Sequence, residues 1–173
     1  MKNAIQKKLL LILSFLSCCN TSIIAQGEYA GSMKKLIGIN YKDSKSIPGL
    51  EDYQFREGSL ISSLDDPEAI TVDVFQKGTT SIAFFSIMED TSTQVFTIMD
   101  LVEVKNVQPG WQLRTAFCRE NEVENVEIFA LVKSSDSEQY LKVVQQAWRF
   151  NRDKRKIQLI SIKGIDCVSE GGG

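Results

Sequence analysis

The sequence ITVDVFQKGTTSIAFFSI, which spans residues 70–87, carries the clearest fold signal in the chain. Apolar and polar side chains alternate over 70–75, and 82–87 is again rich in β-branched and aromatic residues. A period of two places successive side chains on opposite faces of a strand. Lys77-Gly78 lies between the two runs and has the composition of a tight turn. The stretch therefore predicts an antiparallel hairpin.

Strand patterns continue along the rest of the chain. A second apolar pattern covers 94–104 and ends before Pro109-Gly110. Residues 111–118 and 126–133 predict a further pair of strands around an acidic stretch, and 156–165 predicts the last strand. Such close spacing favours an antiparallel sandwich or barrel of about seven to nine strands. The predicted fold class is all-β, or β-rich α+β.

One segment predicts a helix instead. Ser135 and Glu138 resemble a capping box, and the apolar residues behind them recur at helical spacing, which favours a short helix near 136–145. The alternative is that 145–150 is already a strand, which pairs with the last strand through a turn at 151–154. Both features hold if the helix ends where that strand begins.

The lead-in over 26–50 contains glycines, Pro48 and scattered charges. These residues favour turns and irregular structure over long elements. We expect this stretch to be weakly structured, with 33–39 as an edge strand.

The start of the chain has the layout of a secretory signal peptide over residues 1–25. A basic start precedes an apolar run at 9–16, which is too short to cross a bilayer comfortably, and residues 22–25 end in the small residue Ala25. We therefore expect cleavage before Gln26 and a single β-rich domain over 26–173.

A lipoprotein signal is the alternative interpretation of the same leader. Cys18 or Cys19 would then receive a lipid anchor at the end of the apolar run. Both interpretations predict an exported protein, either periplasmic or extracellular, or lipid-anchored in the envelope. The formal net charge of −2 does not favour a nucleic-acid partner, and no later apolar run has the length of a transmembrane span.

Two of the four cysteines, Cys118 and Cys167, lie outside the leader. An even number of cysteines in an exported protein favours a disulfide, because disulfides persist in oxidising compartments. The bridge would fasten the C-terminal strand to the body of the sheet. A catalytic thiol is less favoured, because the chain has no histidine to act as its base.

The absence of histidine also excludes a Ser-His-Asp triad and a histidine-bearing zinc or iron site within this chain. Carboxylates remain as candidates. Asp65, Asp66 and Glu68 are the best candidate calcium ligands, although solvated loops favour the same composition. A carboxylate-dependent hydrolase would draw on Asp65, Asp66 or Glu122. No cofactor is predicted.

Basic and aromatic residues gather near the end of the chain. Arginine beside aromatic rings is enriched in binding surfaces, and this cluster is the candidate site for a protein or an anionic glycan partner. The alternative is a charged hairpin tip whose rings point into the core. The candidate residues are Trp148, Arg149, Arg152, Arg155 and Lys156.

Taken together, these patterns predict a secreted or envelope-associated binding protein without evident catalytic machinery. A small carboxylate-dependent hydrolase that acts on an envelope or extracellular glycan is the first alternative. A structural component of the envelope is the second.

Overall fold

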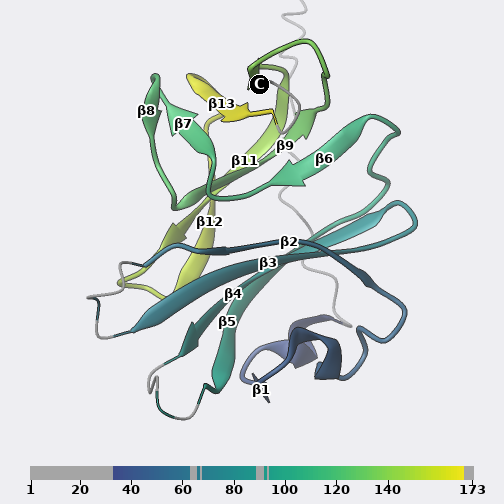
Figure 1. Cartoon of the computed structure of the whole chain (residues 1–173), viewed down its shortest axis with the longest axis vertical. Coiled ribbons are helices and arrows are strands. Elements are labelled where there is room, and N and C mark those ends of the chain that lie inside the picture. Colours follow the sequence, from purple (N-terminus) through teal and green to yellow (C-terminus); the bar gives the residue numbers. More distant parts are fainter. Residues whose placement is uncertain (1–32, 63–65, 67, 89–91, 93, 170–173) are drawn as a thin grey trace, which may run out of the picture.

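The computed structural model describes residues 33–62, 66, 68–88, 92 and 94–169. Over these residues the chain forms three antiparallel sheets (Figure 1). The structure confirms the predicted antiparallel all-β fold class.

The first sheet contains the strands of the N-terminal half, in the order β1-β5-β4-β3-β2. The predicted hairpin over 70–87 is confirmed as β3 and β4, with Val72 opposite Phe85. Its turn uses Gly78 at a φ of 56°, a conformation that glycine adopts without a steric cost. The strands are β1 (Asn40–Tyr41), β2 (Gln54–Leu60), β3 (Ala69–Lys77), β4 (Thr80–Met88) and β5 (Phe96–Val104).

The second sheet has the order β12-β11-β9-β6. The predicted pairing of the 111–118 and 126–133 patterns is confirmed between β6 and β9, where Leu113 faces Leu131. The strands are β6 (Trp111–Arg114), β9 (Ile128–Lys133), β11 (Val144–Asn151) and β12 (Lys156–Ile160).

The third sheet consists of short strands in the order β10-β13-β7-β8. Its strands are β7 (Cys118–Glu120), β8 (Val123–Glu124), β10 (Tyr140–Leu141) and β13 (Ile165–Val168). Side chains of β7, β10 and β13 pack on the second sheet together with Ile128, Ala130 and Ala147. The second sheet is therefore covered on both faces, which explains why β9 is a continuous apolar run rather than an alternating one.

The first and second sheets pack face to face over an aromatic core. Phe85 of β4 lies 5.4 Å from Phe150 of β11, and Phe129 of β9 stacks on Phe150 at 4.7 Å between ring centroids. All three side chains are fully buried. Each ring removes on the order of 150–250 Å² from water, so this cluster contributes much of the apolar burial between the sheets.

The other face of the first sheet is covered by residues 33–53, which pack Leu36, Tyr41 and Ile47 on Phe84. The predicted edge strand over 33–39 is wrong. The chain instead forms a 3-10 helix, η1 (Met33–Leu36), and a second one, η2 (Ser44–Ser46), follows β1. Helical turns bring apolar residues that are three apart to one side, whereas a strand would have placed them on opposite faces.

The predicted helix near 136–145 is also wrong. Tyr140 and Leu141 form β10, and Val144 begins β11. The β-branched Val143 and Val144 favour a strand, and Val144 pairs with Val132 of β9. The alternative interpretation is confirmed for its strand, because β11 continues through a turn onto β12 with Trp148 opposite Leu159.

The described residues contain thirteen strands, more than the seven to nine that the sequence predicts. Four of the strands have two or three residues, which is too short to leave a pattern in the sequence. The longer β2 was missed because most of its side chains are exposed, so apolar and polar residues do not alternate along its sequence.

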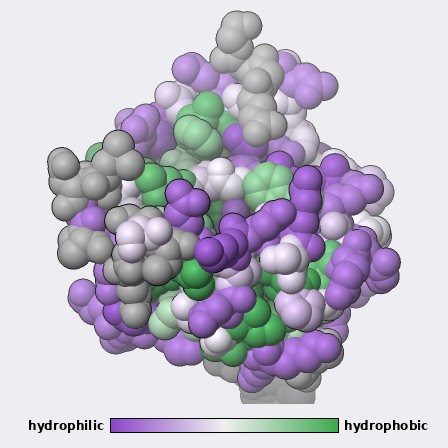
Figure 2. All heavy atoms as spheres, turned by 60° about the horizontal axis from the view of Figure 1, so that its bottom comes forward, coloured by the Kyte–Doolittle hydropathy of each residue, from purple (hydrophilic) through white to green (hydrophobic). Residues whose placement is uncertain are grey.

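Residues 1–25, with Cys18 and Cys19, lie outside the described residues. Among the residues that are described, no helix has both the length and the apolar character needed to cross a bilayer. Figure 2 brings the lower end of Figure 1, with η1 and β1, toward the viewer, and hydrophobic side chains form small separate patches on it among hydrophilic ones.

Candidate binding groove

A polar groove lies where the edge strand of the first sheet, β2, meets the edge strand of the second, β6. Its volume is about 410 Å³, and most of its lining residues are polar or charged. The backbone edges on either side belong to β2 and β6, each of which pairs with a neighbour on one side only. The residues used below are Arg56, Glu57, Gln76, Trp111, Gln112 and Arg114.

A β-bulge in β2 directs Glu57 toward the second sheet. Phe55 pairs with Phe75 and Glu57 pairs with Val74, so Arg56 is an extra residue without a partner across the ladder. Phe75 faces the 33–53 segment and Val74 faces the core between the sheets. The extra residue therefore moves Glu57 to the face opposite that of Phe55, which a regular strand would not do.

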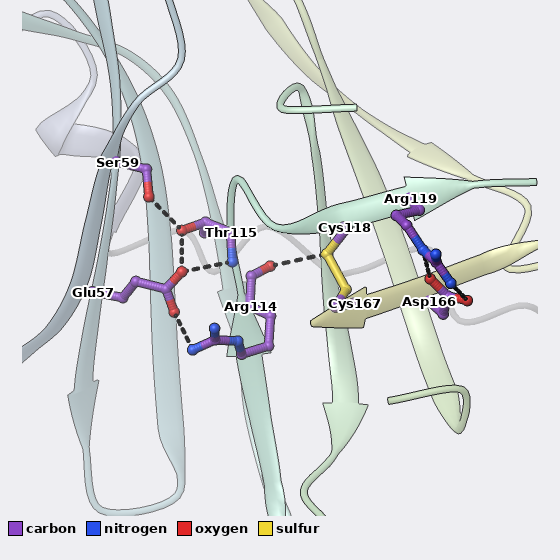
Figure 3. Close-up of a disulfide and its surroundings, with 8 residues drawn as sticks. All are labelled: Glu57, Ser59, Arg114, Thr115, Cys118, Arg119, Asp166 and Cys167. Atoms are coloured by element: carbon purple, nitrogen blue, oxygen red, sulfur yellow. Dashed lines mark hydrogen bonds and ion pairs between the residues drawn. A yellow bond between two sulfur atoms is a disulfide. The ribbon is translucent and has the colours of Figure 1, made fainter. Parts of the chain in front are cut away.

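Glu57 bridges the two edge strands through three contacts (Figure 3). Its Oε2 accepts a hydrogen bond from Arg114 Nη1 at 3.1 Å, and its Oε1 accepts from Thr115 N at 3.0 Å and from Thr115 Oγ1 at 2.7 Å. The side chains of Arg114 and Glu57 are only 4% and 14% exposed. Charge-assisted hydrogen bonds of this kind are short and directional, so they hold one side of the groove in place.

Arg56 places a positive charge in the groove, and one nitrogen of its guanidinium group forms a hydrogen bond within the chain. Its Nε donates to Gln76 Oε1 at 3.0 Å, and Gln76 in turn donates from Nε2 to the carbonyl of Gly78 at 3.0 Å. These bonds orient the guanidinium group. Its terminal amino groups form no hydrogen bond to another described residue at standard geometry and can donate to an anion.

Trp111 and Gln112 add an aromatic ring and a side-chain amide to the groove lining. Trp111 is partly buried against the core between the sheets while it also borders the groove. An indole of this kind offers a flat apolar surface beside polar groups. Gln112 from β6 and Gln76 from β3 contribute side-chain amides, each with both a donor and an acceptor.

The predicted basic and aromatic cluster lies elsewhere, on β11 and β12 and the turn between them. Trp148 is 3% exposed and stacks on Phe129 at 5.0 Å between ring centroids. Phe150 is fully buried. This placement matches the alternative in which the rings of the hairpin point into the core.

The four cations of that cluster all pair with carboxylates of the same chain. Arg152 also donates from Nη2 to the carbonyl of Ile61. These contacts fasten the β11–β12 hairpin to the segment between β2 and β3, and a role in binding a partner stays a prediction. The pairs are Arg149 with Glu120 at 2.6 Å, Arg152 with Asp66 at 3.3 Å and with Glu127 at 2.8 Å, Arg155 with Glu68 at 2.6 Å, and Lys156 with Asp100 at 3.8 Å.

We expect Arg152→Gln to lower the free energy of unfolding by about 1–2 kcal/mol, because the residue joins two carboxylates and a carbonyl while it remains partly exposed. Lys154→Gln is the matched control, since Lys154 is an exposed cation in the same hairpin turn. Urea unfolding of both variants measures the difference. Equal stability of the two variants would contradict the fastening role.

Two of the predicted calcium ligands form ion pairs with these cations. Asp66 contacts Arg152 and Glu68 contacts Arg155, whereas Asp65 lies outside the described residues. The part of the chain that the structure describes contains no group of three or more acidic, cysteine or histidine side chains placed to hold a metal ion. Glu122 is exposed in the turn between β7 and β8, on a different sheet from the loop that holds Asp66.

The predicted disulfide is confirmed, and it lies close to the groove (Figure 3). Cys118 on β7 faces Cys167 on β13 directly, with an S–S distance of 2.02 Å, and both residues are fully buried. Cys118 Sγ lies 3.7 Å from the carbonyl oxygen of Arg114. Beside the bridge, Arg119 forms a two-pronged ion pair with Asp166 at 2.7 and 2.8 Å.

Sequence reasoning missed the groove because its residues lie far apart in the chain. Glu57 and Arg114 are separated by 57 positions, and each stands in a segment that shows no motif. The available signal was Arg114 itself, a charged residue inside a run that otherwise predicts a buried strand. Comparison of the chain with protein-family models, curated proteins and solved structures finds no significant match.

Proposed function

We propose that this protein is an exported binding protein that recognises an anionic glycan in the groove between β2 and β6. The observation that carries the proposal is the combination of Trp111, Arg56 and the amides of Gln76 and Gln112 along one groove. The C–H face of a sugar ring packs on an indole, its hydroxyl groups bond to amides, and its carboxylate pairs with a guanidinium group.

The groove supports binding better than catalysis. Glu57 is the one carboxylate among its described lining residues, and its oxygens are engaged by Arg114 and Thr115. Glycoside hydrolysis commonly requires two carboxyl groups that flank the scissile bond. A carboxylate-dependent hydrolase is the alternative that the experiment below separates from binding, and a structural envelope component is the second alternative.

Export is part of the proposal and has support from two sources. The leader over 1–25 has the composition of a signal peptide. The buried disulfide is of the kind that persists in oxidising compartments. Whether the chain starts at Gln26 or carries a lipid on Cys18 or Cys19 follows from the intact mass of the mature protein.

Isothermal titration with a tetramer of galacturonic acid tests the binding proposal, with the methyl-esterified tetramer as the uncharged ligand. We expect the acidic tetramer to bind more tightly and to keep its chain length when mass spectrometry is run after incubation. A shortened tetramer would support the hydrolase, and no preference for the acidic form would overturn the proposal.

Arg56→Gln is expected to weaken binding of the acidic tetramer at least about tenfold, because it removes a charge-assisted contact. Arg56 is exposed, so the fold should remain intact. Lys163→Gln removes an equally exposed cation outside the groove and should leave the affinity unchanged. Equal losses in both variants would point to general charge attraction.

A further inference from the structure

A second pocket lies on the opposite face of the first sheet, where the 33–53 segment meets β3. Its volume is about 260 Å³. The floor comes from the sheet and the rim from residues that follow β1. The lining residues are Tyr41, Lys42, Asp43, Ser44, Thr71, Asp73 and Phe96.

Asp73 is the central group of this pocket. It alternates with Val72 and Val74, which face the core between the sheets, so its side chain lies on the other face of β3. Tyr41 donates its hydroxyl to Asp73 Oδ2 at 3.1 Å. Burial raises the pKa of the Asp73 carboxyl, and the hydrogen bond from Tyr41 only partly offsets that effect. No arginine or lysine of the described chain forms a salt bridge with Asp73.

Gly58 of β2 makes room for this carboxylate. A Cβ at that position would lie 2.7 Å from Asp73 Oδ1 and 2.8 Å from Phe55 Cζ. Both distances are shorter than real Cβ contacts, so any larger residue must displace the carboxylate or the ring. The absence of a side chain at Gly58 therefore leaves the space that Oδ1 occupies.

Hydroxyl groups add acceptors beside the carboxylate. Thr71 precedes Asp73 by two residues on the same face of β3, and Ser86 lies directly opposite Thr71 on β4. Neither the Thr71 nor the Ser86 hydroxyl meets a hydrogen-bond partner at standard geometry within the described part of the chain. Burial and the charge of Asp73 raise the pKa of Tyr41, while these two hydroxyls act in the opposite direction. The phenol therefore stays a donor to Asp73.

We propose that this pocket binds a primary alkylammonium group, such as the side chain of a lysine in a partner protein. The ammonium would donate to the Asp73 carboxylate, which lines the pocket beside Thr71. The aliphatic stem would pack along Phe96, which stacks on Tyr41 at 5.6 Å between ring centroids. A partly buried carboxylate without a cationic partner gains most from a ligand that brings the missing charge.

The geometry favours an ammonium over a guanidinium group. A guanidinium binds a carboxylate best when both oxygens are available, and Oδ2 of Asp73 already accepts a hydrogen bond from Tyr41. An ammonium is a compact charge with three donors and can use one carboxylate oxygen together with a hydroxyl. The pocket and the groove lie on opposite faces of the first sheet, so this inference does not depend on the glycan proposal.

Titration of the full chain with Nα-acetyl-lysine methylamide, followed by NMR, tests the inference. The norleucine analogue lacks the ammonium group, and the arginine analogue replaces it with a guanidinium group. We expect the lysine ligand to bind with a Kd on the order of millimolar and to shift the amide signals of Thr71 and Asp73. The norleucine ligand should produce no such shifts, and the arginine ligand should bind more weakly.

Asp73→Asn should weaken binding of the lysine ligand at least tenfold, whereas Asp153→Asn removes an exposed carboxylate of the β11–β12 turn, outside the pocket, and should change the affinity less than twofold. Thr71→Val gives a second variant if Asp73→Asn fails to fold, and it should weaken binding about threefold. Arg56→Gln, in the groove, should have no effect here. Equal binding of the norleucine ligand, or unchanged affinity in Asp73→Asn or in Thr71→Val, would overturn the inference.

Discussion

Replacing Cys118 and Cys167 together by alanine is expected to lower the free energy of unfolding by about 4 kcal/mol. The two residues are 49 positions apart, and closing a loop of this length removes much of the conformational entropy of the unfolded chain. The loss is large beside the roughly 5–15 kcal/mol by which a domain is stable. Guanidinium unfolding of the oxidised wild type and the double variant gives the difference directly.

Reductant provides the control for this experiment. The stability of the double variant should not depend on dithiothreitol, whereas wild-type protein unfolded and refolded with dithiothreitol should approach the variant. A loss below about 1 kcal/mol, or a variant that responds to reductant, would contradict the stabilising role. A lower slope with denaturant would show that the bridge also changes the compactness of the unfolded state.

Loss of the disulfide should destabilise the third sheet before the other two sheets. Its strands β7 and β13 share three paired positions, and β10 adds two. So few ladder hydrogen bonds hold a strand weakly without another constraint. We therefore expect the third sheet to depend on the Cys118–Cys167 bridge and on the Arg119–Asp166 ion pair beside it.

The elements that the sequence predicts well are those with a strict local pattern. The β3–β4 hairpin follows from alternation over 70–75 and from Gly78 in its turn. The β6–β9 pair and the β11–β12 hairpin also lie close together in the chain, so each pairing is a local matter. The disulfide followed from counting cysteines and from the predicted compartment.

The errors share one physical cause, which is that tertiary contacts override weak local patterns. Val143 and Val144 fit a helix by spacing and a strand by β-branching, and pairing with β9 selected the strand. The segment 33–39 was apolar enough for a strand. It folds as a helical turn because this conformation packs Leu36 against Phe84 on the outer face of the first sheet.

The candidate sites were harder to predict than the strands. The sequence does not show which distant carboxylate a charged side chain pairs with. Arg152 and Arg155 suggested a surface for an anionic ligand, yet Asp66 and Glu68 lie 86 and 87 positions away and pair with them. Asp73 looked like an ordinary polar position in an alternating strand. It accepts a hydrogen bond from Tyr41, which lies 32 positions away and which no pattern in the sequence connects to it.

Glu57→Leu is expected to lower the free energy of unfolding by about 3–5 kcal/mol, because it removes the Glu57 carboxylate that pairs with the buried guanidinium of Arg114 at 3.1 Å. The same change removes the acceptor of both Thr115 hydrogen bonds. Ser59→Ala, on the same face of β2, is the neighbouring control and should cost under about 1 kcal/mol, since its contact with Thr115 is long, at 3.4 Å.

The double variant Glu57→Leu with Arg114→Met decides what causes that loss. If the penalty comes from breaking the buried ion pair, removing Arg114 as well should restore at least about 1 kcal/mol relative to Glu57→Leu alone. Urea unfolding of the wild type, both single variants and the double variant completes the cycle. Additive losses would show that the two side chains do not interact, and the groove edge would then depend on Thr115 instead. A recovered double variant would show that Glu57 is needed because Arg114 is present.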